Sequence, residues 1–166
     1  MAENTRLKAT NEDNISIVIY QKLGHYLDVI SSVYKIIYSD FQKNKECRNN
    51  ELLFKILRTF KNRIAQLSDV YKKVQEVNRR LSSARGTEAD KINLLGKLLN
   101  VTKKVATAHT PDYYEFLVKL CYQEIKKCAE EVNTKVLVAT NSIERVGMGL
   151  ITSINNLTKI VLQSKR

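Results

Sequence analysis

The stretch that decides the fold is Leu53–Leu81, LFKILRTFKNRIAQLSDVYKKVQEVNRRL. Its apolar residues recur at alternating steps of four and three, which places them on one face of a helix. Four heptads in this register are typical of a coiled coil, and Asn78 is the one polar occupant. The stripe therefore predicts a seam against another helix, from the same chain or from a partner. Its members are Leu53, Leu57, Phe60, Ile64, Leu67, Tyr71, Val74, Asn78 and Leu81.

Further helices are expected on both sides of this stretch. Residues 20–41 carry apolar side chains at the same alternating steps, and the polar residues 43–50 between the two runs predict a loop. Gly86 follows the seam and is expected in the left-handed conformation that ends many helices. Thr87 resembles the N-cap of the next helix, and Thr110 before Pro111 resembles another N-cap.

The last apolar run covers residues 114–161, with steps averaging about 3.6 residues, as in a straight helix. One helix of that length would reach about 70 Å, roughly twice the length of the first run. We therefore expect a break or kink between Val138 and Gly149. Asn141, followed by Glu144 three residues later, resembles a capping box, and Gly147 and Gly149 weaken the helix nearby.

These runs predict an all-α fold, an elongated antiparallel bundle of four to five helices with coiled-coil-like packing. The 166 residues favour one domain, here residues 13–166, and residues 1–12 lack periodicity and are expected to be a flexible N-terminal arm. The chain has 5 Gly, 1 Pro and no Trp, which argues against turn-rich sandwiches and barrels.

The residue types that usually carry catalysis are few and scattered. His25 and His109 lack a metal-ligand spacing, and we interpret both as structural. The three cysteines are too few and odd in number for a disulfide framework; Cys121 and Cys128 lie on the apolar stripe and are expected to act as small hydrophobic residues, with Cys47 in the predicted loop. The sequence thus predicts a non-enzymatic protein with no cofactor, no metal and no small-molecule substrate.

Positive charge is the most informative feature for function. The chain carries 28 Lys and Arg against 17 Asp and Glu, a net charge of +11, and residues 43–85 alone contribute +8. Opposite the seam, a row of bases is expected to face outward; we call it the basic face, and its residues are Arg58, Lys61, Lys72, Lys73, Arg79 and Arg80. A solvated helix is the plainest interpretation, and a contact with an anionic partner is the functional one.

Two hypotheses follow for the function. The first is an interaction or scaffold protein that binds a protein partner, or itself, through helix–helix contacts, with the basic face 43–85 meeting an anionic partner. The second is a basic helical module that binds nucleic acid through phosphates or an anionic membrane through its headgroups. The sequence shows no secretory signal at its start and no apolar stretch that spans a membrane, so we expect a soluble intracellular protein, cytoplasmic or nuclear.

Overall fold

The computed structural model describes the backbone of residues 2–83 and 86–164, and the side chains of residues 14–83, 86–136 and 138–164. Within these ranges all regular structure is helical, which confirms the predicted all-α class. The helices are α1 (Ala2–Lys43), α2 (Lys45–Arg48), α3 (Glu51–Ser83), α4 (Glu88–Ala108), α5 (Pro111–Cys128) and α6 (Lys135–Ser164).

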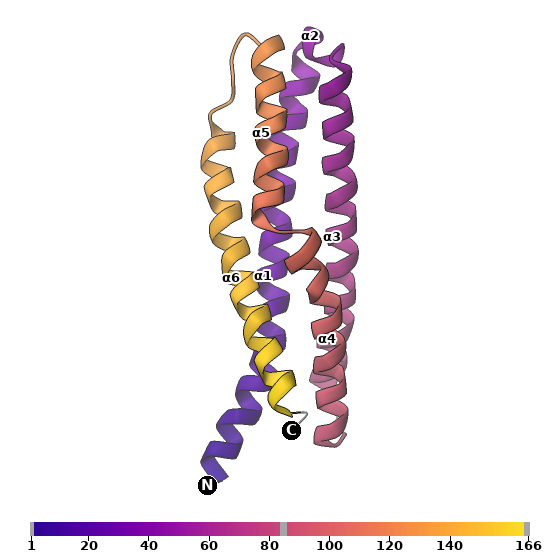
Figure 1. Cartoon of the computed structure of the whole chain (residues 1–166), viewed down its shortest axis with the longest axis vertical. Coiled ribbons are helices and arrows are strands. Elements are labelled where there is room, and N and C mark those ends of the chain that lie inside the picture. The colour runs from indigo at the N-terminus through magenta and orange to yellow at the C-terminus, as the bar shows by residue number, and fades with distance from the viewer. Residues whose placement is uncertain (1, 84–85, 165–166) are drawn as a thin grey trace.

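The helices form an elongated bundle (Figure 1). Helices α1, α3 and α6 run along most of its length, and α4 and α5 follow one another end to end beside them. Helix α3 contacts both α4 and α5, and α6 also contacts both. The chain therefore runs up through α1, down through α3, up through α4 and α5, and down through α6.

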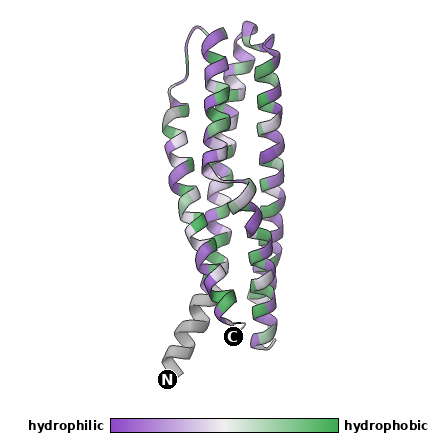
Figure 2. Cartoon of the chain, viewed as in Figure 1, coloured by the Kyte–Doolittle hydropathy of each residue, from purple (hydrophilic) through white to green (hydrophobic). Residues whose placement is uncertain are grey.

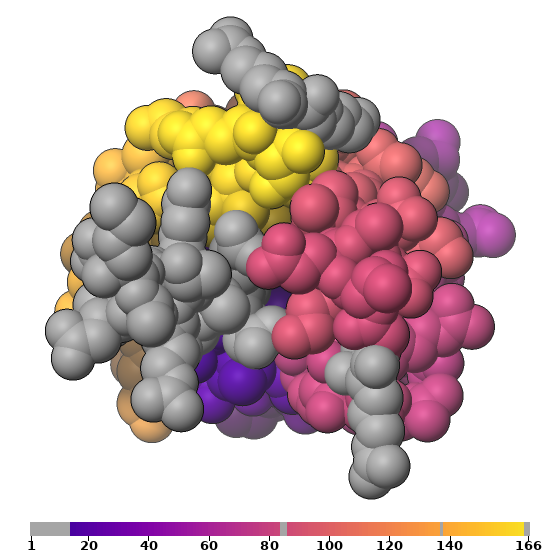
Figure 3. Space-filling view, turned by 90° about the horizontal axis from the view of Figure 1, so that it is seen from below, coloured from indigo at the N-terminus to yellow at the C-terminus, as the bar shows by residue number. Residues whose placement is uncertain are grey.

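A single apolar core extends along the whole bundle and draws residues from all six helices. Figure 2 shows hydrophobic and hydrophilic residues alternating around each helix, as expected when one face is buried. Figure 3 views the end of the bundle where α6, in yellow, lies against α4, in pink. Burial of these stripes is the main stabilising contribution, about 1.5–3 kcal/mol for each large aliphatic side chain.

Both predicted N-caps are confirmed. The Thr87 side chain accepts a hydrogen bond from the Asp90 backbone at 3.4 Å, and the Asp90 carboxylate accepts one from the Thr87 backbone at 3.3 Å. The Thr110 side chain accepts from the Tyr113 backbone, with Pro111 in the first turn of α5. The expectation for Gly86 is wrong, because no glycine in the described backbone has a positive φ.

Of the break or kink predicted between Val138 and Gly149, the break is wrong, because α6 is continuous through these residues. The chain breaks earlier, between Cys128 and Lys135. The Asn133 side chain accepts a hydrogen bond from the Lys135 backbone at 3.1 Å, a local turn that precedes α6. The apolar spacing continues through this loop because Val132, although not helical, is half-buried.

For the arm expected over residues 1–12, the structure describes the backbone of residues 2–12 but not the side chains. The helical backbone of α1 begins at Ala2, so residues 2–12 extend that helix, and the flexibility of the arm stays a prediction.

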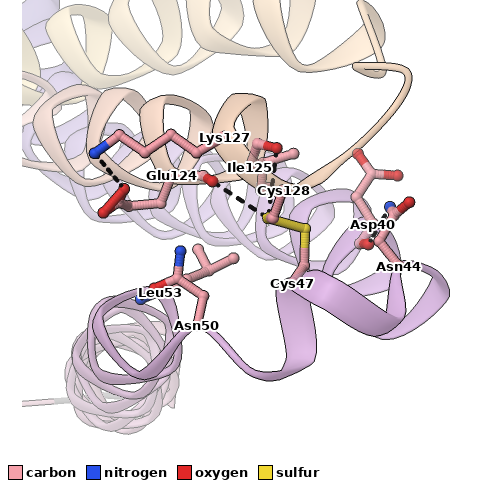
Figure 4. Close-up of a disulfide and its surroundings, with 9 residues drawn as sticks. All are labelled: Asp40, Asn44, Cys47, Asn50, Leu53, Glu124, Ile125, Lys127 and Cys128. Carbon is pink, nitrogen blue, oxygen red and sulfur yellow. Dashed lines mark hydrogen bonds and ion pairs between the residues drawn. A yellow bond between two sulfur atoms is a disulfide. The ribbon is translucent and has the colours of Figure 1, made fainter.

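A disulfide joins Cys47 in α2 to Cys128 at the end of α5, across 81 residues of sequence (Figure 4). The interpretation of Cys128 as a simple hydrophobic residue is therefore wrong, whereas Cys121 is free and buried as expected. Asn44 and Asn50 fix the turn that carries Cys47: the Asn44 side chain donates to the Asp40 carbonyl oxygen at 2.8 Å, and the Asn50 side chain accepts from the Leu53 backbone at 3.0 Å. Cysteine number and spacing do not predict this pairing, because it depends on where α2 lies relative to α5.

The Thr87 cap gives a direct test of how much the α4 terminus contributes to stability. Thr87→Ala removes the acceptor for the Asp90 backbone, and we expect the free energy of unfolding to fall by about 1 kcal/mol. Urea denaturation followed by circular dichroism measures the change. Thr107→Ala is the matched control, since this exposed threonine lies near the other end of α4 and its hydroxyl only donates to a helix carbonyl. Equal effects of the two substitutions would contradict the cap.

Candidate functional site

The seam of α3 packs inside its own bundle. Six of its nine members are buried, while Ile64, Tyr71 and Asn78 are half-buried. Tyr71 stacks on Tyr20 of α1 with 5.1 Å between ring centroids. The seam residues therefore contact the chain's own helices, and in this fold they are not free for a helix from another chain.

Asn78, the polar member of the seam, finds its partner within the chain. Its side-chain oxygen accepts a hydrogen bond from the Ser16 hydroxyl on α1 at 2.9 Å, and Ser16 itself is buried. A polar pair at such a position favours one alignment of two helices, because any other alignment leaves a buried polar group without a partner. Asn78 thus fixes α3 against α1.

All six residues of the basic face are exposed on the outer side of α3, where the sequence places them. Arg58 and Arg80 are 22 residue steps apart, which is about 33 Å of helix. Exposed acids lie on the same side, Glu51 before the bases and Asp69 and Glu76 among them. The face therefore carries a mixed pattern with an excess of positive charge.

Glu76 neutralises part of the basic face. Its carboxylate accepts two hydrogen bonds from the Arg79 guanidinium, at 2.7 and 3.1 Å, and lies 3.5 Å from Arg80. The hydrogen bond from Arg79 holds the pKa of Glu76 below its usual range. Within the described residues, the other four bases have no acidic partner within 4 Å: Arg58, Lys61, Lys72 and Lys73. These four remain available to an external anion.

A second group of polar side chains lies in the middle of the bundle, where α4 ends and α5 begins. The Tyr26 hydroxyl of α1 donates to the His109 carbonyl oxygen at 2.8 Å. The Tyr114 hydroxyl lies 2.6 Å from His109 Nδ1 and 3.4 Å from the Arg63 carbonyl oxygen. Both tyrosines are fully buried, and His109 is 3% exposed. The cluster supplies hydrogen-bond partners for polar groups that the break between α4 and α5 leaves inside the core.

Burial determines the protonation of this cluster. Burial, and after it the positive charge of Arg63, lowers the pKa of His109 to about 4, so the imidazole is neutral at pH 7. Burial also raises the pKa of Tyr26 and of Tyr114 well above the usual value. Neither phenol is therefore activated as a nucleophile, and the hydrogen bonds join neutral groups. The arrangement stabilises the junction of α4 and α5.

His109 also borders an open groove between α3 and α4, of about 240 Å³. Lys73 of the basic face, Asp69 and Lys104 line the same groove. The groove thus carries charges of both signs, and through Lys73 it adjoins the basic face.

The pKa of His109 predicts an acid-dependent loss of stability. The unfolded histidine titrates near 6.5 and the folded one near 4, so the unfolded state binds the additional proton between these values. Stability attributable to His109 is therefore complete above about pH 6.5 and falls as the pH drops towards 4. Urea titrations from pH 4 to 8 measure it, with His109→Gln as the variant that lacks this proton. Parallel pH profiles of the two proteins would contradict the prediction.

Within the described residues, no group of three or more His, Cys, Asp or Glu side chains is placed to hold a metal ion. A search of the same residues finds no helix with both the length and the apolarity needed to cross a membrane.

Comparisons of the chain with protein-family models, with curated proteins and with solved structures gave no match.

Sequence reasoning identified the basic face but missed the cluster around His109. The signal for the helix break is present in Thr110–Pro111, and the sequence predicts only a structural role for His109 directly before it. The burial of Tyr26 and Tyr114 beside that histidine depends on how α1 and α5 meet. No spacing along the chain predicts this contact, since 83 residues separate Tyr26 from His109.

Proposed function

We propose that the protein is a non-enzymatic helical scaffold that docks an acidic protein partner on the basic face of α3. The observation that carries the proposal is the contrast between the two faces of α3. One face is buried in the chain's own core, and the opposite face presents four bases without an acidic partner among the described residues. Such an excess of one sign steers an oppositely charged partner and fixes its orientation.

The interleaved acids favour a protein over a nucleic acid as the partner. A phosphate backbone presents uniform negative charge. Exposed Asp69, which has no base within 4 Å among the described residues, would lie opposite it without compensation, whereas Glu76 is already paired with Arg79. A protein surface can place a base opposite each of these acids and carboxylates opposite Lys72 and Lys73. A mixed pattern therefore discriminates between protein partners.

An exposed aromatic residue on the same side supplies an apolar anchor. Phe54 is 53% exposed and lies one and two turns before Arg58 and Lys61 on the outer face of α3. Protein interfaces commonly combine a large aromatic side chain with surrounding charged residues. Phe54 with the basic face therefore suits an acidic amphipathic helix laid along α3.

The proposal is tested by fluorescence anisotropy with two labelled probes: an acidic amphipathic helical peptide and a 20-base-pair duplex DNA. We expect the peptide to bind the full chain more tightly than DNA at 150 mM salt. Lys72→Glu with Lys73→Glu is expected to weaken peptide binding at least tenfold, because two attractive charges become repulsive. Phe54→Ala is expected to weaken it further.

Lys97→Glu with Lys103→Glu is the matched control, since these exposed lysines of α4 give the same change in net charge away from the basic face. This double variant is expected to bind the peptide with an affinity within about twofold of that of the unmodified chain. An equal loss of peptide affinity in both double variants would mean that binding depends only on the net charge of the protein. That result would contradict a defined docking face. Tighter binding of DNA, with a steep dependence on salt, would replace the proposal with the nucleic-acid alternative.

A further inference from the structure

A small cavity lies between α5 and α6, below the loop that joins them. Figure 1 shows the two helices side by side at this end of the bundle, with the loop arching from one to the other. The cavity has a volume of about 250 Å³ and is open on one side. It lies away from the basic face, because α3 contributes no residue to its lining.

The floor of the cavity is apolar. Val118 of α5 and Val136 of α6 are buried at its base, and the ring of Tyr122 forms one wall. Thr140 also lines it, but the Thr140 hydroxyl donates to the Val136 carbonyl oxygen at 2.7 Å and is satisfied within α6. The floor therefore offers no free hydrogen-bonding group, and a hydrocarbon chain suits it better than a polar ligand.

The charged residues that line the cavity are both positive. Lys119 and Lys126 line it from α5, seven residues and about two turns apart, with the neutral Gln123 between them, and all three are exposed. The Lys126 ammonium lies 4.8 Å from the centroid of the Tyr122 ring, an attraction that holds it beside the opening. Within the described residues neither lysine has an acid within 4 Å, and no acidic side chain lines the cavity.

An apolar floor below two cationic groups is complementary to an amphipathic anion. We propose that this cavity binds a medium-chain carboxylate, with the alkyl chain against Val118 and Val136 and the carboxylate between the ammonium groups of Lys119 and Lys126. The volume limits the chain to about eight carbons, since a water molecule or a methylene group each occupies about 30 Å³. This cavity lies on a surface different from the proposed protein-docking face.

Isothermal titration calorimetry on the full chain tests the proposal with three probes of equal chain length: sodium octanoate, 1-octanol and octylammonium chloride. Octanoate is expected to bind at least tenfold more tightly than octanol, and octylammonium is expected to give no measurable binding. Lys119→Gln with Lys126→Gln is expected to reduce octanoate affinity to that of octanol. Lys97→Gln with Lys103→Gln, on α4, is the matched control and is expected to leave it unchanged.

Thr140→Trp provides an independent test, because the larger side chain fills the cavity from a half-buried position. This variant is expected to abolish octanoate binding while the circular dichroism spectrum stays that of a folded helical protein. Absence of octanoate binding to the unmodified chain would overturn the proposal. Equal affinity for octanoate and octanol would overturn it too, as would octanoate binding that persists in the lysine pair variant.

Discussion

Replacing both Cys47 and Cys128 by alanine is expected to lower the free energy of unfolding by about 4 kcal/mol. The bond closes a loop across 81 residues, and chain-entropy estimates for loops of this size are about 4–5 kcal/mol. The loss of the covalent link enlarges the unfolded ensemble, while the surrounding helices keep their packing. Urea denaturation with and without dithiothreitol measures the effect.

The reductant gives an internal control for this prediction. Dithiothreitol is expected to bring the unmodified protein close to the stability of the double variant, and to leave the double variant unchanged. A denaturation midpoint that does not respond to the reductant would contradict a stabilising bond between α2 and α5. Because disulfides persist mainly in oxidising compartments, the intracellular location expected from the sequence would favour the less stable, reduced chain.

Replacing Gly147 by alanine is expected to lower the free energy of unfolding by about 3 kcal/mol, because the bundle leaves no room for a side chain there. A Cβ atom at Gly147 would overlap the ring of Pro111 and lie 2.8 Å from Cε1 of Tyr26. Neither neighbour can move easily. Pro111 begins α5, and the buried Tyr26 is held by its hydrogen bond to the His109 carbonyl oxygen.

Gly149→Ala is the matched control, two residues further along the same helix. A Cβ atom at Gly149 would meet only the Lys22 ammonium, at 3.9 Å, which is ordinary contact. This substitution is expected to stabilise the protein by up to about 1 kcal/mol, because alanine is a better helix former than glycine. Chemical denaturation of the two variants should therefore give changes of opposite sign. Stabilisation by both would contradict the close approach at Gly147.

Gly147 also illustrates where sequence reasoning fails for this chain. In the sequence, Gly147 indicates a weak point in a helix, and it contributed to the incorrect prediction of a break between Val138 and Gly149. In the structure α6 is continuous, and at Gly147 it packs so close to Pro111 and Tyr26 that a Cβ atom would overlap them. Helix propensity is small in comparison with the packing of a buried helix face, so packing determines the outcome.

The break between α5 and α6 was missed for a related reason. Apolar steps of four residues run from Cys128 through Val132 to Val136, although the chain is not helical between Ala129 and Thr134. The apolar periodicity indicates which residues face the core, and the half-buried loop residue Val132 continues the pattern outside a helix. The position of the turn is instead set by the length of the bundle. Helix α5 ends at the end of the bundle where α2 lies and where α3 begins.

By itself the sequence determined the helical class, the buried face of α3, the caps at Thr87 and Thr110 and the outward position of the basic face. These features depend on residues three or four positions apart, which one turn of helix brings together. Only the tertiary structure decided the Cys47–Cys128 bond, the burial of Tyr26 and Tyr114 around His109, the contact at Gly147 and the cavity between α5 and α6. Each of these requires the distance between separate helices, and that distance is fixed only when the whole bundle packs.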